Sequence, residues 1–142
     1  MECTSRIQAR YNIYMKGYII NIEDATKENK DYRRVLYTAK NSQLVLMSLR
    51  PGEEIGEETH ELDQFIRFEE GEGMAVLDGV EYMIGADYAV VIPQGTRHNV
   101  INTGSDMLKL YSIYAPPEHR DGTTHPTKAE AGEEHFDGKT SE

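Results

Sequence analysis

The sequence contains one cysteine, Cys3, so no disulfide can form within the chain. Disulfides persist mainly in oxidising compartments, and this scarcity of cysteine fits a reducing one. The first residues also lack the basic start and the apolar run that mark a secretory signal. We therefore expect a cytoplasmic protein.

Long apolar runs and an excess of positive charge are missing as well. No stretch approaches the ~20 apolar residues of a membrane-spanning helix, so no membrane association is expected. The 15 lysines and arginines are outnumbered by 25 aspartates and glutamates, which gives a net charge of −10. Such a surface repels phosphate backbones, so nucleic acid is excluded as an expected partner. We interpret the charge as a source of solubility.

What the chain does contain is a β pattern from Arg33 to Pro116. Short apolar runs alternate with Gly, Pro, Asn and Asp, which is typical of strands separated by turns. Asp78 and Gly79, between two such runs, predict a hairpin. Many short, evenly spaced strands favour a single all-β domain, a sandwich or a barrel. The expected strands are 33–38, 43–49, 57–60, 64–69, 73–77, 80–84, 88–92, 98–102 and 107–114.

The flanks of this central part have a different character. Residues 1–14 show no clear period and are interpreted as an extension before the usual start; the alternative is that they pack on the domain as an arm. Residues 15–32 are predicted to form an arm strand and a polar loop with room for one helical turn. The tail, residues 117–142, is expected to be irregular, with a short helix at 128–135.

The most informative stretch is 52–71, which holds Glu58, His60 and Gln64. Residues two apart on an extended chain point to the same side, so Glu58 and His60 can converge. A short turn after His60 brings Gln64 back toward the same point. These side chains are metal-ligand types, and His98 is the candidate for the missing ligand. The alternative is a metal-free pocket in which Glu58 and Gln64 hydrogen-bond the two imidazoles.

Strand alternation predicts what surrounds this cluster. If Gln64 and His98 point into the barrel, alternate residues on the same strands do as well, and Arg67 points outward to a surface or dimer role. Two tail histidines, His119 and His125, either lie in surface loops or join the pocket by folding over the barrel mouth. The expected pocket residues on the strands are Ile66, Phe68, Val100 and Asn102.

The two segments resemble the paired motifs of the cupin superfamily. The first motif, G(X)5HXH(X)3-4E(X)6G, is matched in spacing from Gly52 to Gly71. The second, G(X)5PXG(X)2H(X)3N, is matched from Asp87, which replaces its first glycine, to Asn102. The resemblance implies a double-stranded β-helix, or jelly-roll, barrel over residues 33–116. It is closest to the single-domain, RmlC-like and phosphomannose-isomerase-like members.

The usual three-His, one-Glu ligand set of that family is altered at two positions. Glu58 stands at the first His and Gln64 at the Glu, so the set still contains one carboxylate. This favours a retained site, because random loss would rarely restore the anion. The resemblance therefore implies one divalent transition metal at Glu58, His60, Gln64 and His98: Fe, Mn or Zn, with Ni and Cu also open.

The function that this resemblance implies is a metal-dependent enzyme acting on a small polar metabolite. Its reaction is expected to be either dioxygen chemistry or a sugar-type isomerisation, in the manner of mannose-6-phosphate isomerase. The alternative is a non-catalytic cupin that binds a small molecule or a metal. The resemblance also implies a homodimer, with residues 18–22 as the expected exchanged strand.

Overall fold

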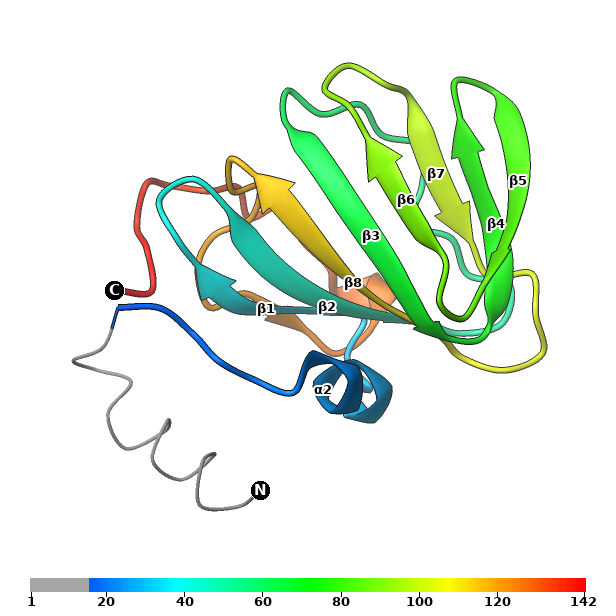
Figure 1. The fold of residues 1–142 in the computed structure, drawn as a ribbon, viewed down its shortest axis with the longest axis horizontal. Coiled ribbons are helices and arrows are strands. Elements are labelled where there is room, and N and C mark those ends of the chain that lie inside the picture. Colours follow the sequence, from blue (N-terminus) through cyan, green and yellow to red (C-terminus); the bar gives the residue numbers. More distant parts are fainter. Residues whose placement is uncertain (1–15) are drawn as a thin grey trace.

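The structure is a computed structural model, and it describes residues 16–142 (Figure 1). The chain forms two antiparallel sheets, one with the strand order β6-β3-β8-β2-β1-β9 and a smaller one with the order β5-β4-β7. The strands are β1 (Arg33–Thr38), β2 (Gln43–Leu49), β3 (Asp63–Glu70), β4 (Glu72–Leu77), β5 (Val80–Gly85), β6 (Ala89–Ile92), β7 (His98–Ile101), β8 (Leu108–Ala115) and β9 (Thr124–His125).

This architecture confirms the all-β fold expected from the sequence. The segments predicted at 33–38 and 43–49 coincide with β1 and β2, and six further segments differ from their strands by one residue at one or both ends. Asp78 (φ 47°) and Gly79 (φ 82°) join β4 to β5 with the positive dihedrals of a two-residue hairpin. The segment predicted at 57–60 is not a strand, because it pairs with β7 only through an isolated bridge.

The core lies between the two sheets and is built from alternate residues of each strand. Met47 on β2, Phe68 on β3 and Leu110 on β8 are completely buried, and they meet Ala75 of β4 and Val100 of β7 from the other sheet. Each such large side chain contributes roughly 1.5–3 kcal/mol by its removal from water. This packing fixes the inward face of β3, and Gln64, the second residue of that strand, projects from the same face.

The turn between β3 and β4 depends on Gly71. Its φ is +96°, and a Cβ on it would lie 2.5 Å from the carbonyl oxygen of Met107. Both the dihedral and the close backbone approach therefore require glycine.

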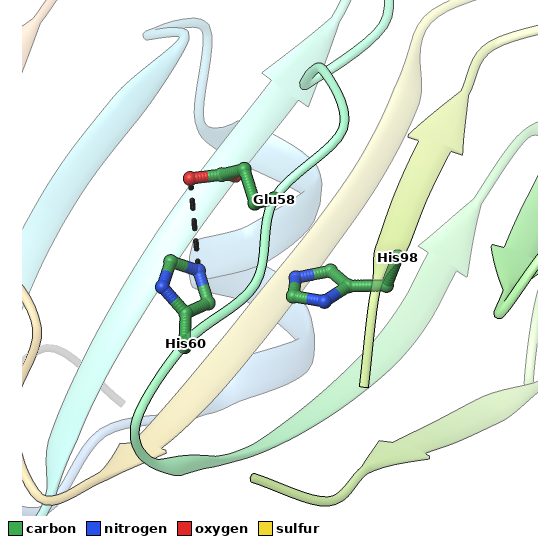
Figure 2. Close-up of side chains that lie close together, drawn as sticks. All are labelled: Glu58, His60 and His98. Carbon is green, nitrogen blue, oxygen red and sulfur yellow. Dashed lines mark ion pairs between the residues drawn. The ribbon is translucent and has the colours of Figure 1, made fainter. Parts of the chain in front are cut away.

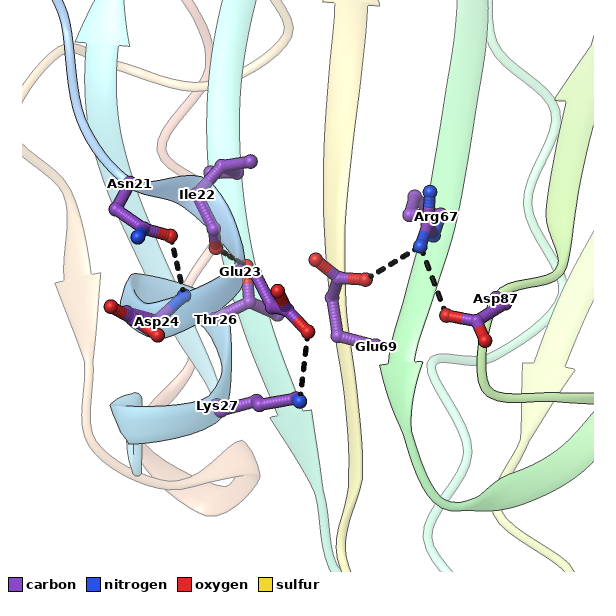
Figure 3. Close-up of polar contacts among 9 residues, drawn as sticks. All are labelled: Asn21, Ile22, Glu23, Asp24, Thr26, Lys27, Arg67, Glu69 and Asp87. Carbon is purple, nitrogen blue, oxygen red and sulfur yellow. Dashed lines mark hydrogen bonds and ion pairs between the residues drawn. The ribbon is translucent and has the colours of Figure 1, made fainter.

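Helix α2 (Ile22–Glu28) precedes the sheets, where the sequence predicted a polar loop (Figure 3). Asn21 caps it, since its Oδ1 accepts from the backbone N–H of Asp24 at 3.1 Å, and Lys27 pairs with Glu23 at 2.9 Å. Residues 18–21, expected to belong to a strand, form none within the described part of the chain. Neither α2 nor any other helix of residues 16–142 is long and apolar enough to cross a membrane.

Arg67 lies on the outer face of β3, as alternation predicted (Figure 3). Its Nη2 is 3.0 Å from Asp87 Oδ1 and 3.1 Å from Glu69 Oε1. Glu69 is only 7% exposed, and α2 packs against β3. These contacts assign Arg67 to the surface of the sheet.

The tail is more ordered than expected. Residues Thr124 and His125 form β9, which pairs with β1 so that His125 lies opposite Arg33. The predicted helix at 128–135 is reduced to one 3-10 turn, Lys128–Glu130, which Thr127 caps. The chain then leaves the turn in an extended conformation at Ala131. The tail therefore closes one side of the larger sheet.

Candidate metal centre

Glu58 and His98 lie opposite each other across an isolated antiparallel bridge. The N–H of Glu58 donates to the carbonyl of His98 at 2.9 Å, and the N–H of His98 donates to the carbonyl of Glu58 at 2.9 Å. Two segments about forty residues apart are thus joined at the positions that carry the candidate ligands. The backbone alone brings these side chains to one place.

His60 completes a group of three (Figure 2). One ligand atom each from Glu58, His60 and His98 lies within 4.8 Å of the other two. Nε2 of His60 is 3.6 Å from Oε2 of Glu58, and the rings of His60 and His98 are 5.2 Å apart. A carboxylate and two imidazoles so placed are within reach of a common divalent ion.

The orientation of both imidazoles leaves a nitrogen available. Nδ1 of His98 is 2.8 Å from the carbonyl oxygen of Thr96, so Nδ1 carries the proton and donates, and Nε2 keeps its lone pair. Nδ1 of His60 faces Oε2 of Glu118 at 3.7 Å, which leaves Nε2 toward Glu58. Outer partners of this kind orient metal-binding histidines.

Gln64 supplies an unusual polar atom. Its side chain is 4% exposed, and its Nε2 donates to Oγ of Ser112 at 3.2 Å. Its Oε1 is buried and accepts no hydrogen bond from residues 16–142. A buried amide oxygen without a partner costs free energy unless something occupies its lone pairs. The donor set and this oxygen therefore fit a bound metal ion.

Burial disfavours the charged forms of Glu58 and His60. Desolvation raises the pKa of Glu58, and the positive charge of Arg33 is the main effect that opposes this rise. Desolvation lowers the pKa of His60 as its largest cause, and the Glu118 carboxylate opposes it. A neutral His60 is the form that binds metal.

The predicted strand residues of the pocket have two different surroundings. Ile66, Phe68 and Val100 belong to the hydrophobic core. The side chain of Asn102 stabilises the loop after β7. Its Nδ2 donates to the carbonyls of Leu49 and Asp106, at 2.9 Å each, and its Oδ1 accepts from the backbone N–H of Gly104. The structure therefore does not bring the Asn102 amide to the three ligands.

The two tail histidines lie on the inner side of the tail. The ring of His119 packs edge-on against Tyr114 at 5.2 Å, and Tyr114 in turn lies 6.0 Å from His60. Burial lowers the pKa of His119 to about 3. His125 is not part of the three-ligand group; it contacts Arg33 and Glu134.

Two residues at the site were missed by sequence reasoning, Glu118 and Arg33. Glu118 follows Pro117 in a stretch that carries no period, so only its position after the last strand could have marked it. Arg33 opens β1, and strand alternation with the buried Val35 places it on the inner face. That parity was readable from the sequence.

A separate hollow of about 290 Å³ lies beside β5 and β6. Its walls are mainly apolar and include Tyr82, Met83, Tyr88 and Val91. It contains none of the candidate ligands. The chemistry-bearing side chains are therefore gathered elsewhere, between the β2–β3 connection and β7.

Comparisons with known proteins agree with this geometry. A family model described as Cupin domain matches residues 45–114. Uncharacterized protein YrkC of Bacillus subtilis (strain 168) is 50% identical over 123 residues, 82% of this chain and 66% of that protein, so the chain spans just under two thirds of YrkC. Uncharacterized protein L612 of Acanthamoeba polyphaga mimivirus is 39% identical over 120 residues, 81% of this chain and 75% of L612. The crystal structure of BH2720 from Bacillus halodurans has a TM-score of 0.79 at 49% identity, and the match covers 82% of this chain and 93% of that one.

Proposed function

Because this chain belongs to the cupin family as a single cupin domain, we propose that it is a metal-dependent enzyme acting on a small polar molecule. The observation that carries the proposal is the convergence of Glu58, His60 and His98, whose ligand atoms lie within 4.8 Å of one another. The unpartnered Oε1 of Gln64 supports the same site, since it is a fourth donor in need of a partner.

Each ligand has a defined part in the proposed site. Glu58 supplies the anionic charge, and its backbone is held by the bridge to His98. His60 and His98 present nitrogens that Glu118 and the Thr96 carbonyl orient from behind. Gln64 adds a neutral oxygen, a weaker donor that a substrate oxygen or water can replace.

This donor set favours an open catalytic site over a closed structural one. Structural zinc sites have four Cys or His ligands, and here only two are His. Two histidines and one carboxylate are the ligand type of non-haem iron(II) oxygenases, so dioxygen chemistry is favoured over sugar-type isomerisation. Iron held here would supply dioxygen activation, and Mn or Zn would instead polarise a substrate oxygen.

The proposal is tested by elemental analysis of untagged protein purified without chelator. We expect near one transition metal per chain in the wild type and none in His98→Ala, with the barrel still folded by circular dichroism. Glu81→Ala is the control, because Glu81 is exposed on β5 and lies outside the ligand group. If none of these proteins holds metal, even after Fe, Mn and Zn are added, the metal-dependent enzyme is refuted and a non-catalytic binding protein takes its place as the proposed function.

We also propose a homodimer formed through the arm before α2. Ile19 is 70% and Ile20 38% exposed, although both are apolar, and their segment forms no strand within the described chain. Pairing with a second copy would cover them. Sedimentation of the wild type should give a dimer, and Ile19→Lys should shift it toward the monomer; a monomeric wild type would refute the dimer.

A further inference from the structure

Arg33 is a buried arginine on the inner face of β1. It is 9% exposed, and it stands opposite Met47 of β2 on one side and His125 of β9 on the other. Its guanidinium carbon lies 5.3 Å from the centre of the Tyr32 ring. A charged group is rarely buried without a partner, so its environment needs an explanation.

No carboxylate among residues 16–142 lies within 4.0 Å of this guanidinium, although the chain is rich in acidic residues. Its Nε is buried and has no hydrogen-bond partner. The neighbouring Arg34 shows the contrast, because it is exposed on the opposite face of the same strand. The Arg33 charge is thus taken out of water without a direct counter-ion.

One contact holds the guanidinium in position. Its Nη1 is 3.4 Å from Nδ1 of His125, and Nε2 of His125 is 2.8 Å from Oε2 of Glu134. If His125 donates through Nε2 to the carboxylate, its Nδ1 is free to accept from Arg33. His125 and Glu134 therefore orient Arg33 while leaving part of its donor fork unused.

Arg33 faces the same interior as the candidate metal centre. Across the larger sheet, Arg33 lies opposite Met47 of β2, Met47 opposite Leu110 of β8, and Leu110 opposite Phe68 of β3, the strand that also carries Gln64. With a divalent ion at Glu58 and the Glu118 carboxylate beside His60, the charges of the metal centre balance, and Arg33 leaves one positive charge inside the barrel. The inside of the barrel is then matched to an anion.

We propose that Arg33 binds the carboxylate of a small anionic substrate inside the barrel, beside the metal centre; this rests on the proposed function and names its substrate class. A planar guanidinium with unused donors matches a carboxylate in two-pronged geometry. A single cation among apolar neighbours such as Met47 and Tyr32 suits a carboxylate better than a phosphate, which carries more charge to be neutralised.

The test uses pyruvate with its neutral isostere pyruvamide, and inorganic phosphate, measured by calorimetry on the metal-free and the metal-loaded full chain. We expect pyruvate to bind the wild type and pyruvamide to bind at least tenfold more weakly, because charge-assisted hydrogen bonds are lost. Arg33→Met should lower pyruvate affinity by about ten- to a hundredfold, and Arg34→Met should leave it unchanged. Equal binding of pyruvate and pyruvamide, or tighter binding of phosphate, would overturn the proposal.

Stability separates this role from a structural one. Arg33 has no direct counter-ion, so Arg33→Met loses one hydrogen bond, to His125, and it should melt within a few degrees of the wild type without ligand. If Arg33→Met does not fold, Arg33→Lys serves instead, because it keeps the charge and loses the fork, and it should weaken pyruvate binding. Arg33-dependent binding in a protein that holds no metal would sink the enzyme proposal alone, and metal binding with Arg33-independent pyruvate affinity would sink this one alone.

Discussion

Glu58 and His98 exchange two backbone hydrogen bonds of 2.9 Å, so their side chains are neighbours whatever those side chains are. Glu58→His should therefore leave the barrel folded and restore a third imidazole. We expect metal to be retained with a changed preference, because a neutral ligand replaces the anion. Competition between Fe and Zn, read by elemental analysis, checks this; complete loss of metal would show that the carboxylate is essential.

Gln64→Met tests whether the buried amide oxygen serves a ligand. Oε1 of Gln64 has no hydrogen-bond partner in the described part of the chain, so its removal should cost the metal-free protein no more than about 1 kcal/mol, the contribution of the hydrogen bond to Ser112. Metal affinity should fall. Denaturant unfolding with and without added metal measures both effects, and a large loss of metal-free stability would mean that the amide is structural.

Glu118→Gln addresses the orientation of His60. The carboxylate lies 3.7 Å from Nδ1 of His60, and loss of such an outer partner typically weakens metal binding about 10–100-fold. Titration with a competing chelator measures the change. Glu133→Gln, an exposed carboxylate of the same tail, is the control and should have no effect; equal weakening by both would point to general electrostatics.

His119 gives the stability a predictable pH dependence. Burial lowers its pKa to about 3 from an unfolded value of 6.5, so the folded state resists its protonation. Its contribution is complete above pH 6.5 and is lost as the pH falls from 6.5 toward 3. When the pH falls from about 7.5 to about 4.5, the free energy of unfolding should decrease in both proteins. The decrease should be smaller in His119→Phe than in the wild type, by on the order of 2 kcal/mol. Parallel profiles from urea unfolding would contradict this.

Gly71→Ala and Gly52→Ala separate backbone strain from collision. Both glycines have positive φ, but a Cβ meets backbone atoms only at Gly71, at 2.5 Å from the Met107 carbonyl oxygen. Gly52→Ala should cost about 1 kcal/mol and Gly71→Ala roughly 3 kcal/mol or more. Thermal melts of the two variants give the comparison; equal losses would mean that the loop at Met107 yields.

Much of the barrel was predictable because its strands alternate apolar and polar residues and are separated by turn-forming residues. β1 and β2 were placed to the residue, and the Asp78-Gly79 turn was recognised from a dipeptide whose dihedrals only a tight hairpin uses. Helix α2 was expected only as a polar loop with room for one helical turn, because the segment offers the Asn21 cap and the Glu23–Lys27 pair but no apolar stripe.

The candidate site was predictable only in part. Motif spacing pointed to Glu58, His60 and His98, which the fold brings together. Asn102 shares a spacing with those ligands and yet serves the loop, because spacing does not show where an amide finds its hydrogen bonds. Glu118 enters through the path of the tail after β8, and nothing in local periodicity encodes such a return.

The proposed ligands do not all belong to one sheet. His98 lies on β7 of the smaller sheet, and Glu58 is tied to it, whereas Gln64 lies on β3 of the larger one. A metal ion held by these ligands would therefore cross-link the two sheets. Local opening of one sheet would then be coupled to opening of the other. Metal loading should accordingly slow amide hydrogen exchange in both sheets together.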